Sequence, residues 1–195
     1  MAGFRSIAAV GRSIESLLNA AFATVPPVEG EVTRAVLVQT DDLALETDSL
    51  IIRPALSILL YRIDFNKTMR AGWSGTGSDE GGARLPLDLH FLITAWAENA
   101  DHEHRILGRA LQVLEEVGAL SGPLLDPDGE WLAHETVQLY LEDMATDDLM
   151  RTFDSLECDF RLSIPYIARV VVLRSEGLPT TEVLTFVRGL APVTS

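Results

Sequence analysis

The alternation of apolar and polar residues is clearest between Leu85 and Glu116. In the first part of this stretch, one parity is apolar throughout: Leu85, Leu87, Leu89, Phe91 and Ile93. A period of two is typical of a strand that buries one face. The other parity also contains Leu92 and Trp96. We therefore expect a strand inside a sheet that has material packed on both sides.

The period changes in the second part of the stretch. Apolar residues recur there at intervals of three and four: Ile106, Leu107, Ala110, Leu111, Val113, Leu114 and Val117. This spacing predicts an amphipathic helix. Asp101 suits the N-cap position, and Gly118 suits the C-terminal stop. The strand followed by this helix is the predicted centre of the fold.

Weaker patterns define the other elements. Residues 4–22 predict an amphipathic helix, and Thr146 is the predicted N-cap of a short one. Further strands are predicted over residues 32–38, 55–65, 136–141 and 160–173. Pro165 cannot donate a ladder hydrogen bond, so we expect a sheet edge, a bulge or a strand start there. Residues 41–48 are acidic and predict an exposed connection.

The order of these elements predicts a single α/β (α+β) domain, with a mixed central β-sheet flanked by helices. Residues 72–84 contain five glycines and predict a loop that takes part in an interaction. We assign residues 1–175 to the domain and residues 176–195 to a C-terminal extension. The extension is expected either to dock on the core or to reach a neighbouring subunit.

Composition narrows the classes of partner. The chain has 195 residues and a formal net charge of -14 at pH 7. Such a surface repels nucleic acid and anionic membranes. We find no signal-peptide pattern at the N-terminus and no apolar run long enough to span a membrane. We therefore expect a protein made and folded in the cytosol, with no nucleic-acid binding and no membrane insertion.

Candidate catalytic residues surround the junction of the central strand and helix. Asp88 and His90 share a strand parity, and His102 and His104 fall in the first helical turn. Carboxylate and imidazole groups of this kind would suit a metal-assisted hydrolase. Residues two apart on a helix do not share a face, however, and no nucleophile lies near His90 in the sequence. Hydrogen-bonding and solvent-exposed roles are therefore favoured, and no metal or other cofactor is predicted.

Other polar groups give weaker signals. The glycine-rich segment lacks the ending of a Walker motif. Cys158 has acidic neighbours, which raise a thiol pKa, so we expect an inert cysteine. One acidic group predicts a solvated face: Glu142, Asp143, Asp147 and Asp148.

Four residues are candidate interface contacts. Arg70, Trp73 and Arg84 lie within or beside the glycine-rich loop, and Trp131 lies in loop-like surroundings. Tryptophan is enriched at interaction hot spots. For Trp73 and Trp131, interface contact and internal packing are equal alternatives. Trp96, on the central strand, is expected in the core.

Three segments in order, residues 56–70, 85–116 and 139–173, resemble a known family. The matching features are Tyr61, Asn66 and Arg70, the Pro-Leu-x-Leu-x-x-x-Leu-x-Thr strand from Pro86 to Thr94, the helix with His104 and Leu107-Gly108, the helix from Leu149 to Phe153, and the strand from Arg161 to Tyr166. In this order and spacing they are similar to the cap or tube-terminator proteins of phage-tail-like contractile injection systems. Phe153 replaces an expected tryptophan, and Pro165 is unusual within the last strand.

The resemblance implies a structural role. Members of that family are similar in fold to phage tail terminators, and they form a six-fold ring on the baseplate-distal end of the inner tube. The resemblance thus implies a hexameric homo-oligomer that stops tube growth, with the inner tube protein and the sheath protein as partners. It implies assembly in the bacterial cytoplasm, on a particle that is either released or retained.

Two other functions stay open at this point. The first is a soluble adaptor that recruits other components of the same particle. The second is the metal-assisted hydrolase, built on Asp88, His90, His102 and His104. The resemblance itself requires no catalytic site and no cofactor.

Overall fold

The computed structural model describes residues 2–44, 50–69, 84–156 and 158–174. Within these residues, six strands form one sheet in the order β1-β2-β3-β6-β5-β4. The strands are β1 (Arg34–Val38), β2 (Ala55–Phe65), β3 (Arg84–Trp96), β4 (Ala119–Ser121), β5 (Thr136–Leu141) and β6 (Ser163–Arg174). The helices are α1 (Ser6–Thr24), α3 (Ala100–Val117) and α4 (Thr146–Ser155), with short 3-10 helices η1 (Thr40–Ala44), η2 (Gly122–Leu124) and η3 (Pro127–Gly129). β1 is parallel to β2 and the other pairs are antiparallel, so the predicted mixed sheet with flanking helices is confirmed.

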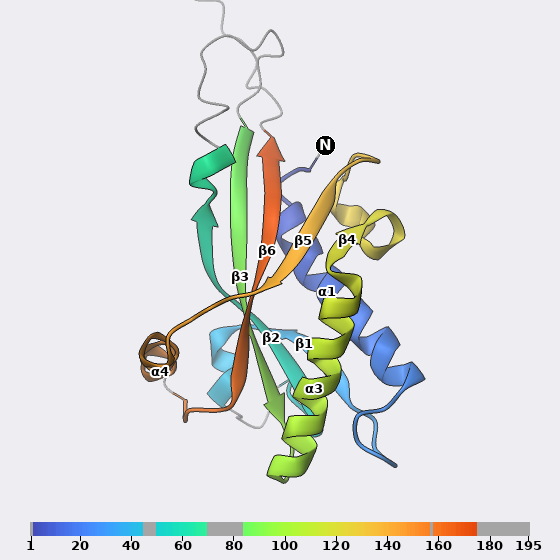
Figure 1. Cartoon of the computed structure of the whole chain (residues 1–195), viewed down its shortest axis with the longest axis vertical. Helices are drawn as coiled ribbons and strands as arrows, with labels where there is room; N and C mark the ends of the chain where they lie inside the picture. The colour runs from blue at the N-terminus through green and yellow to red at the C-terminus, as the bar shows by residue number, and fades with distance from the viewer. Residues whose placement is uncertain (1, 45–49, 70–83, 157, 175–195) are drawn as a thin grey trace, which may run out of the picture.

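β3 is the central strand, as its sequence pattern predicts. It pairs with β2 along one edge and with β6 along the other. Every residue from Pro86 to Trp96 is buried, which requires cover on both faces of the sheet. Figure 1 shows α1 and α3 on one side of the twisted sheet and α4 on the opposite side.

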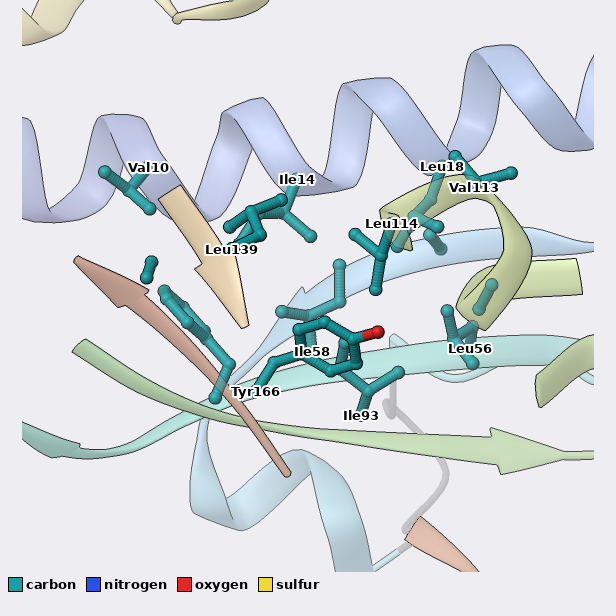
Figure 2. Packing of buried hydrophobic residues seen from close by; sticks show 14 of the residues in the cluster. Val10, Ile14, Leu18, Leu56, Ile58, Ile93, Val113, Leu114, Leu139 and Tyr166 are labelled. Atoms are coloured by element: carbon teal, nitrogen blue, oxygen red, sulfur yellow. The ribbon is translucent and has the colours of Figure 1, made fainter. Parts of the chain in front are cut away.

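The larger core lies between the sheet and the pair α1 and α3. Figure 2 shows Val10, Ile14 and Leu18 of α1 directed at the sheet, where β3 presents its odd-numbered residues. Burying each such side chain contributes roughly 1.5–3 kcal/mol. The buried Tyr166 of β6 also donates a hydrogen bond of 2.8 Å to the carboxylate of Glu115, which fastens the sheet to α3.

A smaller core lies on the opposite face. It consists of Val38, Leu43, Ile51, Ala55, Leu59, Leu92, Trp96 and Phe153. The indole N–H of Trp96 donates to Ser57 Oγ at 2.8 Å, and the Arg161 guanidinium lies 4.3 Å from the ring centre. Trp96 is therefore a core residue, as predicted. Of the connection predicted over residues 41–48, the described part is not wholly exposed, because η1 places Leu43 in this core; residues 45–48 lie outside the described residues.

The two predicted N-caps are wrong by one or two residues. Asn99 caps α3, since its side chain accepts a hydrogen bond of 2.9 Å from the backbone N–H of His102. Asp101 instead lies in the first turn and pairs with Arg105 at 2.8 Å. Ala145, not Thr146, occupies the N-cap position of α4. The stop at Gly118 is confirmed: this residue has a φ of 60°, which glycine adopts without strain.

α1 closes the outer edge of β1. The Asn19 side chain accepts from the N–H of Ala35 at 2.9 Å and donates to its carbonyl at 2.8 Å. Glu15 accepts from the N–H of Leu37 at 3.2 Å. The helix can approach this closely because Gly11 has no side chain; a Cβ there would lie 2.9 Å from Leu37. This end of the sheet is therefore closed to further strands.

Pro165 lies near the start of β6, which is one of the three predicted settings. Pro165 lies opposite Leu92 of β3, but its carbonyl accepts from the N–H of Glu142 at 2.9 Å, so the position of the missing N–H faces away from β3. β5 joins β6 only from Tyr166 onward, so no described strand needs that donor. The segments 70–83 and 175–195 lie outside the described residues. The glycine-rich loop and the domain boundary at residue 175 therefore stay predictions. No helix in the described ranges combines the length and the apolar character needed to cross a membrane.

Candidate interaction surface

The face of β3 that carries Trp96 becomes polar at its other end. Asp88 and His90 lie on this face and are 8% and 4% exposed. A bulge in β2 between Leu60 and Arg62 aligns Arg62 with His90 and Asp64 with Asp88. The bulge therefore gathers four ionisable side chains on one half of one sheet face.

Glu142, just after β5, joins this group from across the sheet. Its carboxylate accepts hydrogen bonds from the Tyr61 hydroxyl at 2.8 Å, from His90 Nδ1 at 2.9 Å and from Arg62 at 2.9 Å. An ionised carboxylate only accepts hydrogen bonds, so Nδ1 of His90 carries a proton. The other ring nitrogen lies 3.3 Å from Asp64. We call Tyr61, Arg62, Asp64, His90 and Glu142 the polar cluster.

The electrostatics of the polar cluster fit these donor and acceptor roles. Burial alone would raise the pKa of Glu142, but hydrogen bonds from His90 and Tyr61 and the charges of His90 and Arg62 lower it. Burial raises the pKa of the Tyr61 hydroxyl, and the bond to Glu142 raises it further. At neutral pH, Glu142 is therefore an ionised acceptor and Tyr61 a protonated donor. The cluster ties the end of β5 to β2 and β3.

A second group of polar residues continues the surface. Asn66 donates to both carboxylate oxygens of Asp88 at 3.2 Å, and Arg169 lies 3.6 Å from the same carboxylate. These residues, with Asp64, Phe65, Lys67, Thr68 and His90, line an open cavity of about 490 Å³. The cavity holds charges of both signs, which suits a polar contact with another protein.

The structure does not bring together the four residues of the hypothetical metal-assisted hydrolase, Asp88, His90, His102 and His104, in a metal site. Asp88 and His90 make contacts on the sheet, whereas His102 and His104 lie among the first five residues of α3. In the described ranges, no group of three or more His, Cys, Asp or Glu side chains could hold a metal ion. Burial and the charge of Asp159 raise the thiol pKa of Cys158, although Arg161 opposes this, in line with the inert cysteine predicted.

Two of the four candidate interface residues fall within the described ranges. Arg84 is exposed at the start of β3. Trp131 is half-buried, donates to the Asp126 carbonyl at 2.8 Å, and lies so close to Gly129 that a Cβ there would meet its ring at 2.3 Å. Arg70 and Trp73 lie outside the described residues. The interface role of all four stays a prediction.

The sequence did not indicate the role of Glu142, which accepts hydrogen bonds from three side chains of the polar cluster. Glu142 was expected on a solvated acidic face, yet only 13% of its side chain is exposed. The parity of β3 did signal Asp88 and His90. Nothing local signals that a residue 52 positions after His90 returns to it.

The free edge of β2 is the other feature of this end of the sheet. β1 pairs with β2 from Ala55 to Leu59. From Leu60 to Asp64, no described strand lies on that side of β2. Ile63 projects from this half with 45% of its surface exposed, on the face opposite the polar cluster. An exposed strand edge with an apolar side chain is a ready template for strand pairing.

Comparison with known proteins places this α+β architecture among terminator-like folds. Residues 9–184 match the Pvc16 N-terminal domain family. The chain therefore belongs to the Pvc16 N-terminal domain family, which confirms the resemblance to contractile-injection tube terminators. No curated protein sequence matches the chain.

Two solved structures are similar in fold. The first is the sheath/tube terminator of an extracellular contractile injection system, PVC, in its extended state, with 16% identity and a TM-score of 0.55. The matched region covers 96% of this chain and 65% of the terminator chain. The second is the tube-terminating cap of the anti-feeding prophage, with 16% identity, a TM-score of 0.56, and coverage of 95% and 60%. This chain thus spans less than two thirds of the length of either protein.

Proposed function

We propose that this chain is a structural subunit that terminates the inner tube of a contractile injection particle. Family membership over residues 9–184 carries the proposal. It is supported by the similarity in fold to two proteins described as terminators, over nearly all of this chain. On this view, the chain performs no catalysis and binds no cofactor. The domain of residues 1–175 is the part that stops growth of the inner tube.

The proposed form is a ring of six copies at the baseplate-distal end, with the tube protein and the sheath protein as partners. The net charge of -14 favours a basic partner surface. Arg70, Trp73, Arg84 and Trp131 are proposed as contacts. Two observations favour the described pair: Arg84 is exposed, and Trp131 lines an open cavity of about 340 Å³. Assembly takes place in the bacterial cytoplasm.

The test has a biochemical arm and a particle arm. Native mass spectrometry of the full chain, alone and with purified tube protein, should show a closed ring that binds tube ends. Electron microscopy of particles from cells lacking this protein should show tubes of uncontrolled length or tubes without sheath. A monomer that never binds tubes would refute the proposal. Normal tube ends in the deletion particles would instead indicate the adaptor function.

Charge reversal tests the proposed contacts directly. Arg84 is exposed at the start of β3, opposite Arg174 at the end of β6. If it contacts the next copy, Arg84→Glu should weaken ring assembly. Arg151→Glu is the matched control, since Arg151 lies on α4 with 79% of its side chain exposed. Equal assembly of both variants would remove Arg84 from the interface and leave the ring itself in place.

A further inference from the structure

The outer edge of β1 and the neighbouring edge of β2 differ in whether other groups cover them. The outer edge of β1 is closed by the side chains of Asn19 and Glu15. The half of β2 from Leu60 to Asp64 extends past β1 and has no described strand on that side. Its residues become progressively exposed, from half-buried Leu60 to exposed Asp64. Backbone groups on an unpaired edge of this kind are a template for the addition of another strand.

The side chains of this edge suit a strand rather than a broad protein face. Ile63 aligns with Leu89 of β3, so it points to the side of the larger core, where it is 45% exposed. Arg62 and Asp64 point to the other side and pair with each other at 3.1 Å. The edge is therefore close to neutral, although the whole chain carries a net charge of -14. A weakly charged strand can approach it without the repulsion between two acidic subunits.

The chain carries one segment of suitable sequence beyond β6. Between Pro179 and Gly189, the residues Val183, Thr185 and Val187 alternate with Leu184 and Phe186. β-branched and aromatic residues with a period of two are typical of a strand. Residues 181–187 contain one charged residue, Glu182. β6 ends at Arg174, which pairs with Arg84 at the same end of the sheet as the open half of β2.

We propose that residues 181–187 of one copy add as a strand to the Leu60–Asp64 edge of β2 in the next copy. The inference rests on the proposed ring. A closed ring needs a contact between two different surfaces, so that each copy offers both and the contact repeats around the axis. The segment and the edge are such a pair. The backbone hydrogen bonds supply affinity, and Ile63 supplies an apolar contact.

Two full-length variants and a control test the contact. Ile63→Lys places a charge on the edge, and Leu184→Asp with Phe186→Asp disrupts the segment. Val32→Lys is the control, since Val32 is 76% exposed and lies before β1. We expect either variant to raise the concentration needed for ring assembly by roughly tenfold or more, and the control to leave it unchanged. Native mass spectrometry measures assembly, and thermal melting verifies that each variant is folded.

Mixing the two variants separates a contact between copies from one within a copy. The segment variant retains an intact edge, and the edge variant retains an intact segment. A contact between copies therefore predicts heterodimers in the mixture and no closed ring. A segment that folds back on its own copy predicts no heterodimer. It also predicts that those backbone amides of Leu60–Asp64 that point away from β3 are protected from hydrogen exchange in dilute monomer.

The outcomes also separate this inference from the proposed function. Unchanged assembly of both variants would overturn the strand exchange and leave the terminator ring standing. Protection, in dilute monomer, of the Leu60–Asp64 amides that point away from β3 would do the same. If the wild-type chain forms no ring and binds no tube, the proposed function fails first. Heterodimers in the mixture, together with the loss of rings in each variant alone, would support both.

Discussion

Glu142→Ala removes the acceptor on which three side chains of the polar cluster converge. Tyr61, His90 and Arg62 donate to this carboxylate over 2.8, 2.9 and 2.9 Å. The substitution removes the carboxylate acceptor of His90 Nδ1 in a site where only 5% of the His90 side chain is exposed. A buried donor without an acceptor costs free energy, because folding still removes it from water.

The three contacts do not contribute equally to the free energy of unfolding. Arg62 is 44% exposed and keeps Asp64 at 3.1 Å, so its bond to Glu142 is screened and contributes little. The bonds from His90 and Tyr61 are the substantial ones. Breaking them should cost about 2–4 kcal/mol. For a chain of this size, that lowers the melting temperature by roughly 4–16 °C.

Differential scanning calorimetry of three variants measures the effect. Glu142→Ala should show the full loss, and Glu142→Gln less than half of it, because one amide oxygen can still accept from both Tyr61 and His90, which bond the same oxygen of Glu142, although without its charge. Asp143→Ala is the matched control, since it removes the adjacent, exposed carboxylate. A melting temperature for Glu142→Ala within about 1 °C of this control would refute the assigned network.

Three further outcomes are expected. Tyr166→Phe should lower the free energy of unfolding by about 1 kcal/mol in urea titrations, because it deletes the bond from β6 to Glu115 on α3; no change would show that this bond contributes nothing. Asn19→Ala should cost roughly 1–3 kcal/mol and promote concentration-dependent association, since it opens the edge of β1 at Ala35; light scattering that stays at the wild-type level would contradict the closure. Acid should destabilise the wild type more than Glu142→Gln. The pKa of Glu142 is lowered on folding, so its contribution is complete above its ordinary value of 4.5 and is lost as pH falls through the lowered value. Parallel urea midpoints for the two proteins between about pH 3 and 6 would rule this out.

The polar cluster and the free edge of β2 have different consequences for the proposed ring. The cluster fixes β5 against β2 and β3 with hydrogen bonds that are internal to one copy. The edge of β2, on the same strand, leaves backbone groups directed outward. An ordered strand edge is a suitable acceptor, because a strand that docks on it loses little free energy to ordering the receptor.

The sequence by itself predicted the three α-helices and five of the six strands in the described residues, and missed only the short β4 (Ala119–Ser121). β2, β3, α3 and β5 were predicted within a residue or two, because burial on one face imposes a period that is visible locally. The same alternation predicted cover on both faces of β3 and placed Trp96 in the core. It also placed Asp88 and His90 on one strand face, although not their partners.

Only the tertiary structure decided how these polar residues are used. The bulge before Arg62 shifts the register of β2, and a one-residue shift exchanges the faces of every later residue. Glu142 then meets His90 because β5 and β3 both flank β6. The cap at Asn99 depends on where the helix starts, which competing acceptors leave ambiguous in sequence. The open edge of β2 is likewise invisible locally, since it exists only because β1 ends at Val38, opposite Leu59.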